Sequence, residues 1–66
     1  MKNTVQMLRK SRRITQEDLA KTVGVTRQTI ISIENGKYTA SLVLAMKIAK
    51  VFGLRVEEIF ELEEND

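Results

Sequence analysis

The chain has 66 residues, a net charge of +2, and no histidine or cysteine. This length predicts one small domain that covers residues 1–66. Without His or Cys the chain lacks the usual zinc ligands, a thiolate nucleophile and the commonest general base. We therefore expect no enzyme, no metal site, no cofactor and no small-molecule ligand. No secretory or membrane-spanning segment is visible in the sequence, which favours the cytoplasm and argues against a membrane partner.

The charges divide the chain into a basic part and an acidic part. Residues 1–37 contain eight Lys and Arg against three Asp and Glu, a net charge of +5. Residues 38–66 contain three Lys and Arg against six Asp and Glu, a net charge of −3. This division indicates one side of the domain that faces a polyanion.

Apolar spacing and end residues predict the first two helices. The first carries the apolar pair Val5 and Leu8 and closes with cations within residues 9–13, where the helix dipole favours them. Thr15 begins the second helix as an N-cap followed by acidic residues, and Gly24 ends it.

A third helix is predicted over residues 27–35, with Thr26 as its N-cap and Gly36 at its end. Asn35-Gly36 is also a hairpin signal when alternating apolar residues flank it. The cap at Thr26 and the scarcity of strand-forming residues after Tyr38 favour the helix.

Two more helices complete an all-α class, a compact five-helix bundle. Ser41 caps the fourth helix, Gly53 ends it, and its predicted buried stripe is Leu42, Ala45, Ile48, Ala49 and Phe52. The fifth is short and carries the apolar residues Val56, Ile59 and Phe60. The acidic tail, residues 61–66, is expected to fray.

Residues 15–36 contain two short capped helices separated by Gly24-Val25, which is a helix-turn-helix pattern. At 100° per residue, Ile30 and Ile33 of the second of these helices point toward the core. Its opposite arc carries Arg27, Gln28, Ile31, Ser32 and Asn35, where an ordinary solvated face would show Glu and Lys.

These side chains suit the reading of DNA bases. An arginine such as Arg27 pairs with two acceptors of guanine, and a glutamine such as Gln28 pairs with adenine. Ile31 fits either a thymine methyl group or an ordinary exposed apolar position. Ser32 is short, and its contact with a base would run through water.

At these residues the chain resembles the helix-turn-helix regulators of the phage Cro and repressor type, the xenobiotic-response-element family. The resemblance runs from Leu8 to Phe60 and includes the distinctive piece Ile33-Glu34-Asn35-Gly36-Lys37. Other matching pieces are Leu8-Arg9-Lys10, Ile14 to Ala20, Gly24 to Ile30, Ser41-Leu42, Ala45 to Ile48, and Phe52-Gly53 to Phe60. It implies a five-helix bundle that binds operator DNA, usually as a symmetric dimer.

The resemblance also implies roles for single residues. The base-reading positions are Arg27, Gln28 and Ser32, with Ile31 on the same arc. The positions that contact the sugar-phosphate backbone are Gln16, Thr26, Asn35 and Lys37. Gln16 would also brace the first polar residue of the reading helix, and Arg9 and Glu34 would form a structural ion pair beneath it.

Some positions depart from the family pattern. Thr39-Ala40 stands where proline is common, and Arg55 occupies the place of a usual helix cap. Val43 and Met46 fall on the outward side of the fourth helix, where polar residues are typical. The expected homodimer interface consists of Val43, Met46, Val56, Ile59, Phe60 and Leu62.

The most favoured function is therefore a homodimeric transcriptional regulator that binds double-stranded DNA, acts as a repressor on a palindromic operator, and works in the cytoplasm in association with the nucleoid. The alternative is a protein-interaction module of the same fold, such as an antitoxin or a bridging factor.

Overall fold

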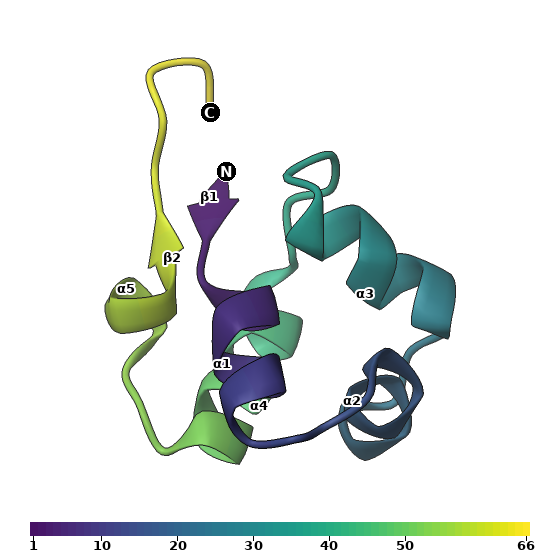
Figure 1. The fold of residues 1–66 in the computed structure, drawn as a ribbon. Helices are drawn as coiled ribbons and strands as arrows, with labels where there is room; N and C mark the ends of the chain where they lie inside the picture. The colour runs from purple at the N-terminus through teal and green to yellow at the C-terminus, as the bar shows by residue number, and fades with distance from the viewer.

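Five helices and two short strands make up the computed structural model, which describes residues 1–66 (Figure 1). In chain order the elements are β1 (Lys2–Asn3), α1 (Val5–Ser11), α2 (Gln16–Val23), α3 (Arg27–Glu34), α4 (Leu42–Phe52), α5 (Val56–Ile59) and β2 (Phe60–Glu61). The five helices confirm the predicted class, whereas the two strands were not expected from the sequence.

The predicted hydroxyl caps begin three of the helices. In each case the side-chain oxygen of the cap accepts a hydrogen bond from the backbone N–H three residues later, which satisfies a donor that the helix itself leaves free. The bonds join Asp18 to Thr15 (3.0 Å), Thr29 to Thr26 (3.3 Å) and Leu44 to Ser41 (3.2 Å).

The segment at Asn35-Gly36 ends α3 and does not form a hairpin. Gly36 has a φ of +73°, which glycine adopts without a steric penalty. The N–H of Lys37 then donates to the carbonyl of Ser32 over 3.0 Å, which is the bond of a left-handed helix end. The helical prediction for this segment is therefore confirmed.

The hydrophobic core draws on all five helices. Its 13 buried residues are Val5, Leu19, Ala20, Val23, Ile30, Ile33, Leu44, Ala45, Ile48, Ala49, Phe52, Ile59 and Phe60. The prediction for α4 was wrong at one position, because Leu42 is 72 % exposed and Leu44 is buried instead. Leu44 begins the inward face of α4, whereas Leu42 lies in the helix's first turn and points to solvent.

The two ends of the chain lie side by side (Figure 1). β1 and β2 pair antiparallel, with Lys2 opposite Glu61 and Asn3 opposite Phe60. The amino group of Met1 lies 3.2 Å from Glu63 Oε1 and 3.3 Å from Asp66 Oδ1. Of the tail that was expected to fray, Glu61 instead belongs to a strand with Phe60, directly after α5 ends at Ile59.

The side chain of Asn3 fastens this small sheet to the helices. Its Nδ2 donates to the carbonyl of Ile33 over 2.8 Å, near the end of α3. Its Oδ1 accepts from the N–H of Val5 over 3.2 Å, at the start of α1. β1 therefore holds the beginning of one helix and the end of another.

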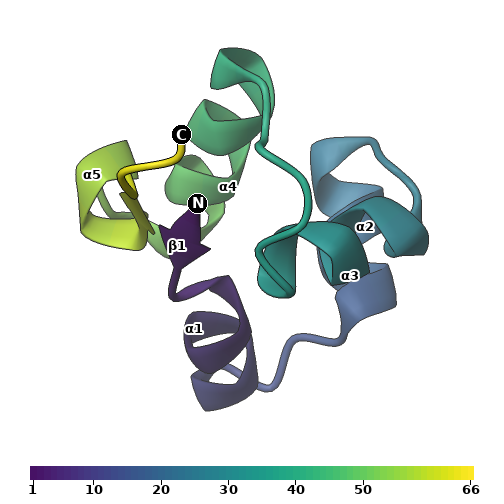
Figure 2. The ribbon, with the colours of Figure 1, turned by 90° about the horizontal axis from the view of Figure 1, so that it is seen from above.

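The helices fall into two groups that place the candidate site. Seen from above, α2 and α3 lie together on one side, α5 lies on the other, and α1 and α4 lie between them (Figure 2). None of the helices combines the length and the apolar character that crossing a bilayer requires.

Candidate nucleic-acid interface

The helix pair α2–α3 presents one face of α3 to solvent. Ile30 and Ile33 are fully buried, and they fix this helix against the core. On the other side Arg27 and Gln28 are exposed, whereas Ile31 and Ser32 are half-buried. The structure thus brings the four expected base-reading residues onto the outward side of one helix.

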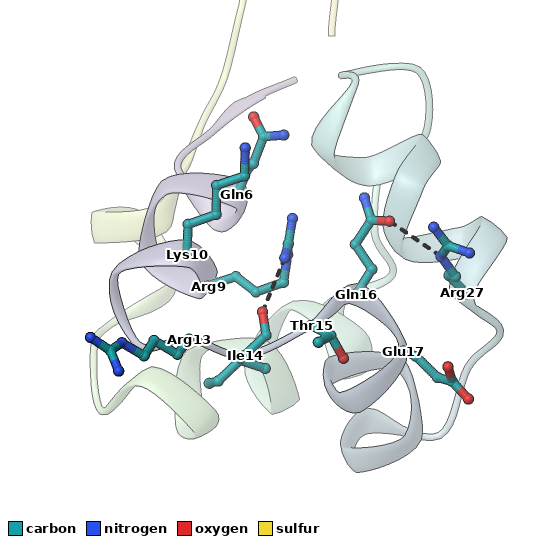
Figure 3. Close-up of a pocket in the computed structure, with 9 residues that line it drawn as sticks. All are labelled: Gln6, Arg9, Lys10, Arg13, Ile14, Thr15, Gln16, Glu17 and Arg27. Atoms are coloured by element: carbon teal, nitrogen blue, oxygen red, sulfur yellow. Dashed lines mark hydrogen bonds between the residues drawn. The ribbon is translucent and has the colours of Figure 1, made fainter.

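Arg27 is held in place by a neighbour on α2. Its Nε donates to Oε1 of Gln16 over 3.3 Å, and the two side chains face each other across the start of α2 (Figure 3). The terminal guanidinium nitrogens of Arg27 make no hydrogen bond within the chain. The arrangement orients the arginine and leaves its two forward donors free.

Gln16 is itself oriented by Glu34. The Nε2 of Gln16 donates to Glu34 Oε1 over 3.1 Å, which directs the amide oxygen of Gln16 toward Arg27. The bracing role implied by the resemblance is therefore visible as a bond between Gln16 and the first residue of α3.

Glu34 forms an ion pair with Arg9, as the resemblance implied. Arg9 Nε lies 2.7 Å from Glu34 Oε2, and Arg9 Nη2 lies 3.2 Å from Oε1. The side chains are 9 % and 2 % exposed, and the remaining Arg9 nitrogen donates to the carbonyl of Ile14 over 3.0 Å. Each charged group has its partners, which a buried ion pair requires.

The residues expected to contact the DNA backbone lie at both ends of α3. Thr26 caps its start, and Gln16 lies beside that start at the beginning of α2. Asn35 and Lys37 follow its end and are exposed. The four residues expected to contact the DNA backbone therefore lie on either side of the outward face of α3.

A groove beside this face contains cations from α1. The residues that line it are Gln6, Arg9, Lys10, Arg13, Ile14, Thr15, Gln16, Glu17 and Arg27 (Figure 3). Sequence reasoning did not assign Lys10 to the site. Its position four residues after Gln6, on one side of α1, is the signal that could have found it.

Arg12 and Arg13 have different surroundings although they are neighbours. Arg12 Nη2 donates to the carbonyl of Phe52 over 2.8 Å, and its guanidinium lies 5.3 Å from the Phe52 ring centroid. Arg12 therefore stabilises the end of α4 through a hydrogen bond and a cation–π contact. Arg13 lines the groove instead.

The expected dimer residues divide into exposed and buried ones. Val43, Met46 and Leu62 are 63 %, 56 % and 74 % exposed. Ile59 and Phe60 are only 2 % and 8 % exposed, so assigning them to a dimer interface was wrong. Both lie in the core because α5 ends at Ile59 and the chain then turns back into β2.

A largely apolar groove lies between α4 and α5, apart from the face of α3. Val43, Met46 and Val56 line it, and Leu54 and Ala49 complete its apolar wall. Charged residues surround this wall, namely Lys47, Lys50, Arg55 and Glu57. Leu62 is exposed but does not line the groove.

The arrangement of α2, the turn and α3 defines a helix-turn-helix DNA-binding domain, and comparison with known proteins agrees. The sequence model of the helix-turn-helix family matches residues 5–59. The chain belongs to this family of DNA-binding transcriptional regulators.

Several relatives match over the whole chain. It is 56 % identical to an HTH-type transcriptional regulator of Methanocaldococcus jannaschii, with all of both chains covered. It is 52 % identical to another from Bacillus subtilis, again over all of both chains. Among solved structures, the restriction-modification controller protein C.AhdI of Aeromonas hydrophila superposes with a TM-score of 0.77 at 30 % identity, covering 85 % of each chain.

Proposed function

We propose that the protein is a transcriptional repressor that recognises a specific palindromic sequence in double-stranded DNA as a homodimer. The observation that carries this proposal is the orientation of the Arg27 side chain by Gln16. Its Nε is bound by Gln16, and its terminal nitrogens are free on the outward face of α3. A side chain oriented in this way loses little conformational freedom when it binds.

Arg27 would read guanine. Its two terminal nitrogens can donate to O6 and N7 in the major groove, which is the commonest specific contact between an amino acid and a base. Gln28 would read adenine in the same way, and Ile31 and Ser32 would contact the next base pair, Ile31 through a thymine methyl group.

The residues around α3 would set its position on the DNA. Gln16 and Thr26 at one end and Asn35 and Lys37 at the other would bind phosphates of the two strands that border the major groove. Such contacts fix orientation and depth without reading sequence.

The apolar groove between α4 and α5 would form the dimer interface. A two-fold contact is self-complementary, so Val43, Met46 and Val56 of one protomer would meet the same residues of its partner. Leu62 would extend this contact. Two reading helices would then lie about 34 Å apart, which is one turn of DNA. A dimer bound over a promoter would exclude the polymerase.

The experiment that tests the proposal is selection from a random pool of double-stranded DNA at about 0.15 M salt with competitor, conditions that suppress non-specific binding. Recovery of an inverted repeat with half-site centres about one helical turn apart would support specific recognition by a dimer. Recovery of no common sequence would contradict the proposal.

Two variants separate the roles within the site. Arg27→Ala is expected to cost about 1–3 kcal/mol and to relax the preference at one base position. Lys37→Ala is expected to weaken binding to all sequences alike and to lower the salt dependence. Equal losses on selected and random DNA for Arg27→Ala would contradict its base-reading role. A reporter gene with the selected operator in its promoter tests repression.

A further inference from the structure

The groove in Figure 3 joins the face of α3 to the end of α1. Arg27 lies on one side of it, Lys10 and Arg13 lie on the side of α1, and the beginning of α2 with Gln16 lies between them. The groove therefore continues away from the reading helix, past a residue already proposed to bind phosphate.

Two cations at the end of α1, Lys10 within the helix and Arg13 just after it, are not neutralised within the chain. Neither Lys10 nor Arg13 takes part in any of the salt bridges of the structure. Glu17 is the acidic residue that lines the groove, and its carboxylate lies 3.5 Å from the amino group of Lys21. It is therefore paired with a lysine outside the groove and not with Lys10 or Arg13. Arg9 also lines the groove, and its charge is balanced by Glu34. The groove thus presents excess positive charge to a ligand.

Arg13 has a left-handed backbone conformation, which glycine adopts more readily than arginine. Its φ is +57°, the left-handed region in which glycine and asparagine are most at ease. The N–H of Ile14 donates to the carbonyl of Arg9 over 3.0 Å, so Arg13 stands where glycine commonly ends a helix. An arginine that breaks this local rule suggests a role for its side chain outside the fold.

The contrast with Arg12 supports this interpretation. Arg12 carries the same side chain one residue earlier, and its guanidinium is engaged by Phe52 in a structural contact. Arg13 is one of the residues that line the groove, its guanidinium makes no hydrogen bond within the chain, and its side chain extends away from Gln16 and Arg27 (Figure 3). The end of α1 therefore separates a cation that serves the fold from one that is available to a ligand.

We propose that Lys10 and Arg13 bind phosphates of the DNA strand that Gln16 contacts, farther along its backbone. This inference rests on the proposed function and adds α1 to the helices that contact DNA. The ligand is the sugar-phosphate backbone, which Lys and Arg bind without regard to sequence. Each contact releases counterions, so its contribution is visible in the salt dependence of binding.

The variants that test this are Lys10→Gln and Arg13→Asn, alone and combined. Asn removes the charge of Arg13 and still adopts the left-handed conformation, so melting temperature is expected to stay at or above that of the parent chain. Lys2→Gln is the matched control, since it removes one positive charge from an exposed side chain on β1 that lines neither the groove of Figure 3 nor the groove between α4 and α5. Circular dichroism confirms that all variants are folded.

Dissociation constants are measured against salt concentration on the selected operator and on a random duplex of equal length. Each groove variant removes one phosphate contact per protomer, at about 0.9 in the slope of log K against log salt per contact, so the slope for a dimer is expected to fall by about 1.8, and by about twice that in the double variant. Lys2→Gln is expected to leave the slope unchanged. Base preferences, measured by repeating the selection, are expected to be those of the parent chain.

An unchanged slope for the double variant on both duplexes would overturn the inference. An equal fall for Lys2→Gln would also overturn it, because overall charge would then explain the effect. A failure of the proposed function looks different: the parent chain would bind both duplexes with equal affinity. The slopes on the random duplex would still decide whether Lys10 and Arg13 contact phosphate.

Discussion

The carboxylate of Glu34 lies 2.7 Å from Nε of Arg9 and joins α3 to α1 beneath the outward face of α3. The same carboxylate accepts a bond from Gln16, which in turn holds Arg27. One buried acid therefore connects the packing of three helices to the orientation of the leading side chain of the site. Removing Arg9 is therefore expected to lower mainly the stability of the fold, and removing Gln16 is expected to weaken mainly the recognition of DNA.

Arg9→Met is expected to lower the free energy of unfolding by about 3–5 kcal/mol, because it leaves the carboxylate of Glu34 buried without its partner. The double variant Arg9→Met with Glu34→Leu is expected to recover much of this loss, since neither charge then remains in the interior. Urea denaturation measures both values. A single variant within about 1 kcal/mol of the parent chain would contradict the structural role.

Gln16→Ala is expected to weaken binding to the selected operator by about tenfold and to make the preference at the guanine read by Arg27 shallower. The arginine would lose the bond that orients it, whereas the fold would lose only a partly exposed side chain. Gln6→Ala is the matched control, because Gln6 lines the same groove without a hydrogen bond to Arg27. Selection with each variant gives the preference. An unchanged preference in Gln16→Ala would show that Arg27 needs no brace.

Met46→Glu is expected to shift the protein from dimer to monomer, because it places a charge in the apolar groove between α4 and α5. Leu42→Glu is the control on the same helix, since Leu42 is exposed outside that groove. Sedimentation equilibrium at micromolar concentration, with and without DNA, measures the effect. If the parent chain is monomeric in both conditions, the dimer itself is wrong.

The first turn of α5 is expected to become less stable at acidic pH. Hydrogen bonds from the backbone N–H and then the side chain of Arg55 hold the pKa of Glu58 below the ordinary glutamate value of 4.5. A carboxylate with a lowered pKa stabilises the folded state above the unfolded-state pKa, and this contribution disappears as the pH falls through the folded value. The protection of α5 amides against exchange, relative to the intrinsic exchange rate at each pH, should therefore fall below about pH 4.5.

Glu58→Gln is expected to remove this pH-dependent component. Glu57→Gln is its neighbouring control, because Glu57 makes no hydrogen bond to Arg55. Amide exchange followed by NMR across the acid range distinguishes the two. An acid response in Glu58→Gln equal to that of the parent chain would assign the effect to another group.

The helix starts were predictable because their chemistry is local. Thr15, Thr26 and Ser41 each bond to a backbone N–H three residues away, and such spacing is visible in the sequence. The burial of Leu44 instead of Leu42 was missed, since both residues are leucines and only the packing of α4 on the core distinguishes them.

Features that depend on distant parts of the chain were not predictable. The strands β1 and β2 need a pairing between residues near the two ends, and nothing in either short segment indicates its partner. The same pairing buries Phe60, which local spacing placed on a surface. The different surroundings of Arg12 and Arg13 likewise depend on where Phe52 lies in three dimensions.

Because Lys2 pairs with Glu61, the sheet of β1 and β2 cannot form until residue 61 has left the ribosome. The contacts between α2 and α3 need only residues 16–34, and local contacts form early in folding. A nascent chain would therefore carry a formed reading helix before Asn3 is positioned by the closed sheet to bond the carbonyl of Ile33. Fastening of the end of α3 is expected to be the last step of folding during synthesis.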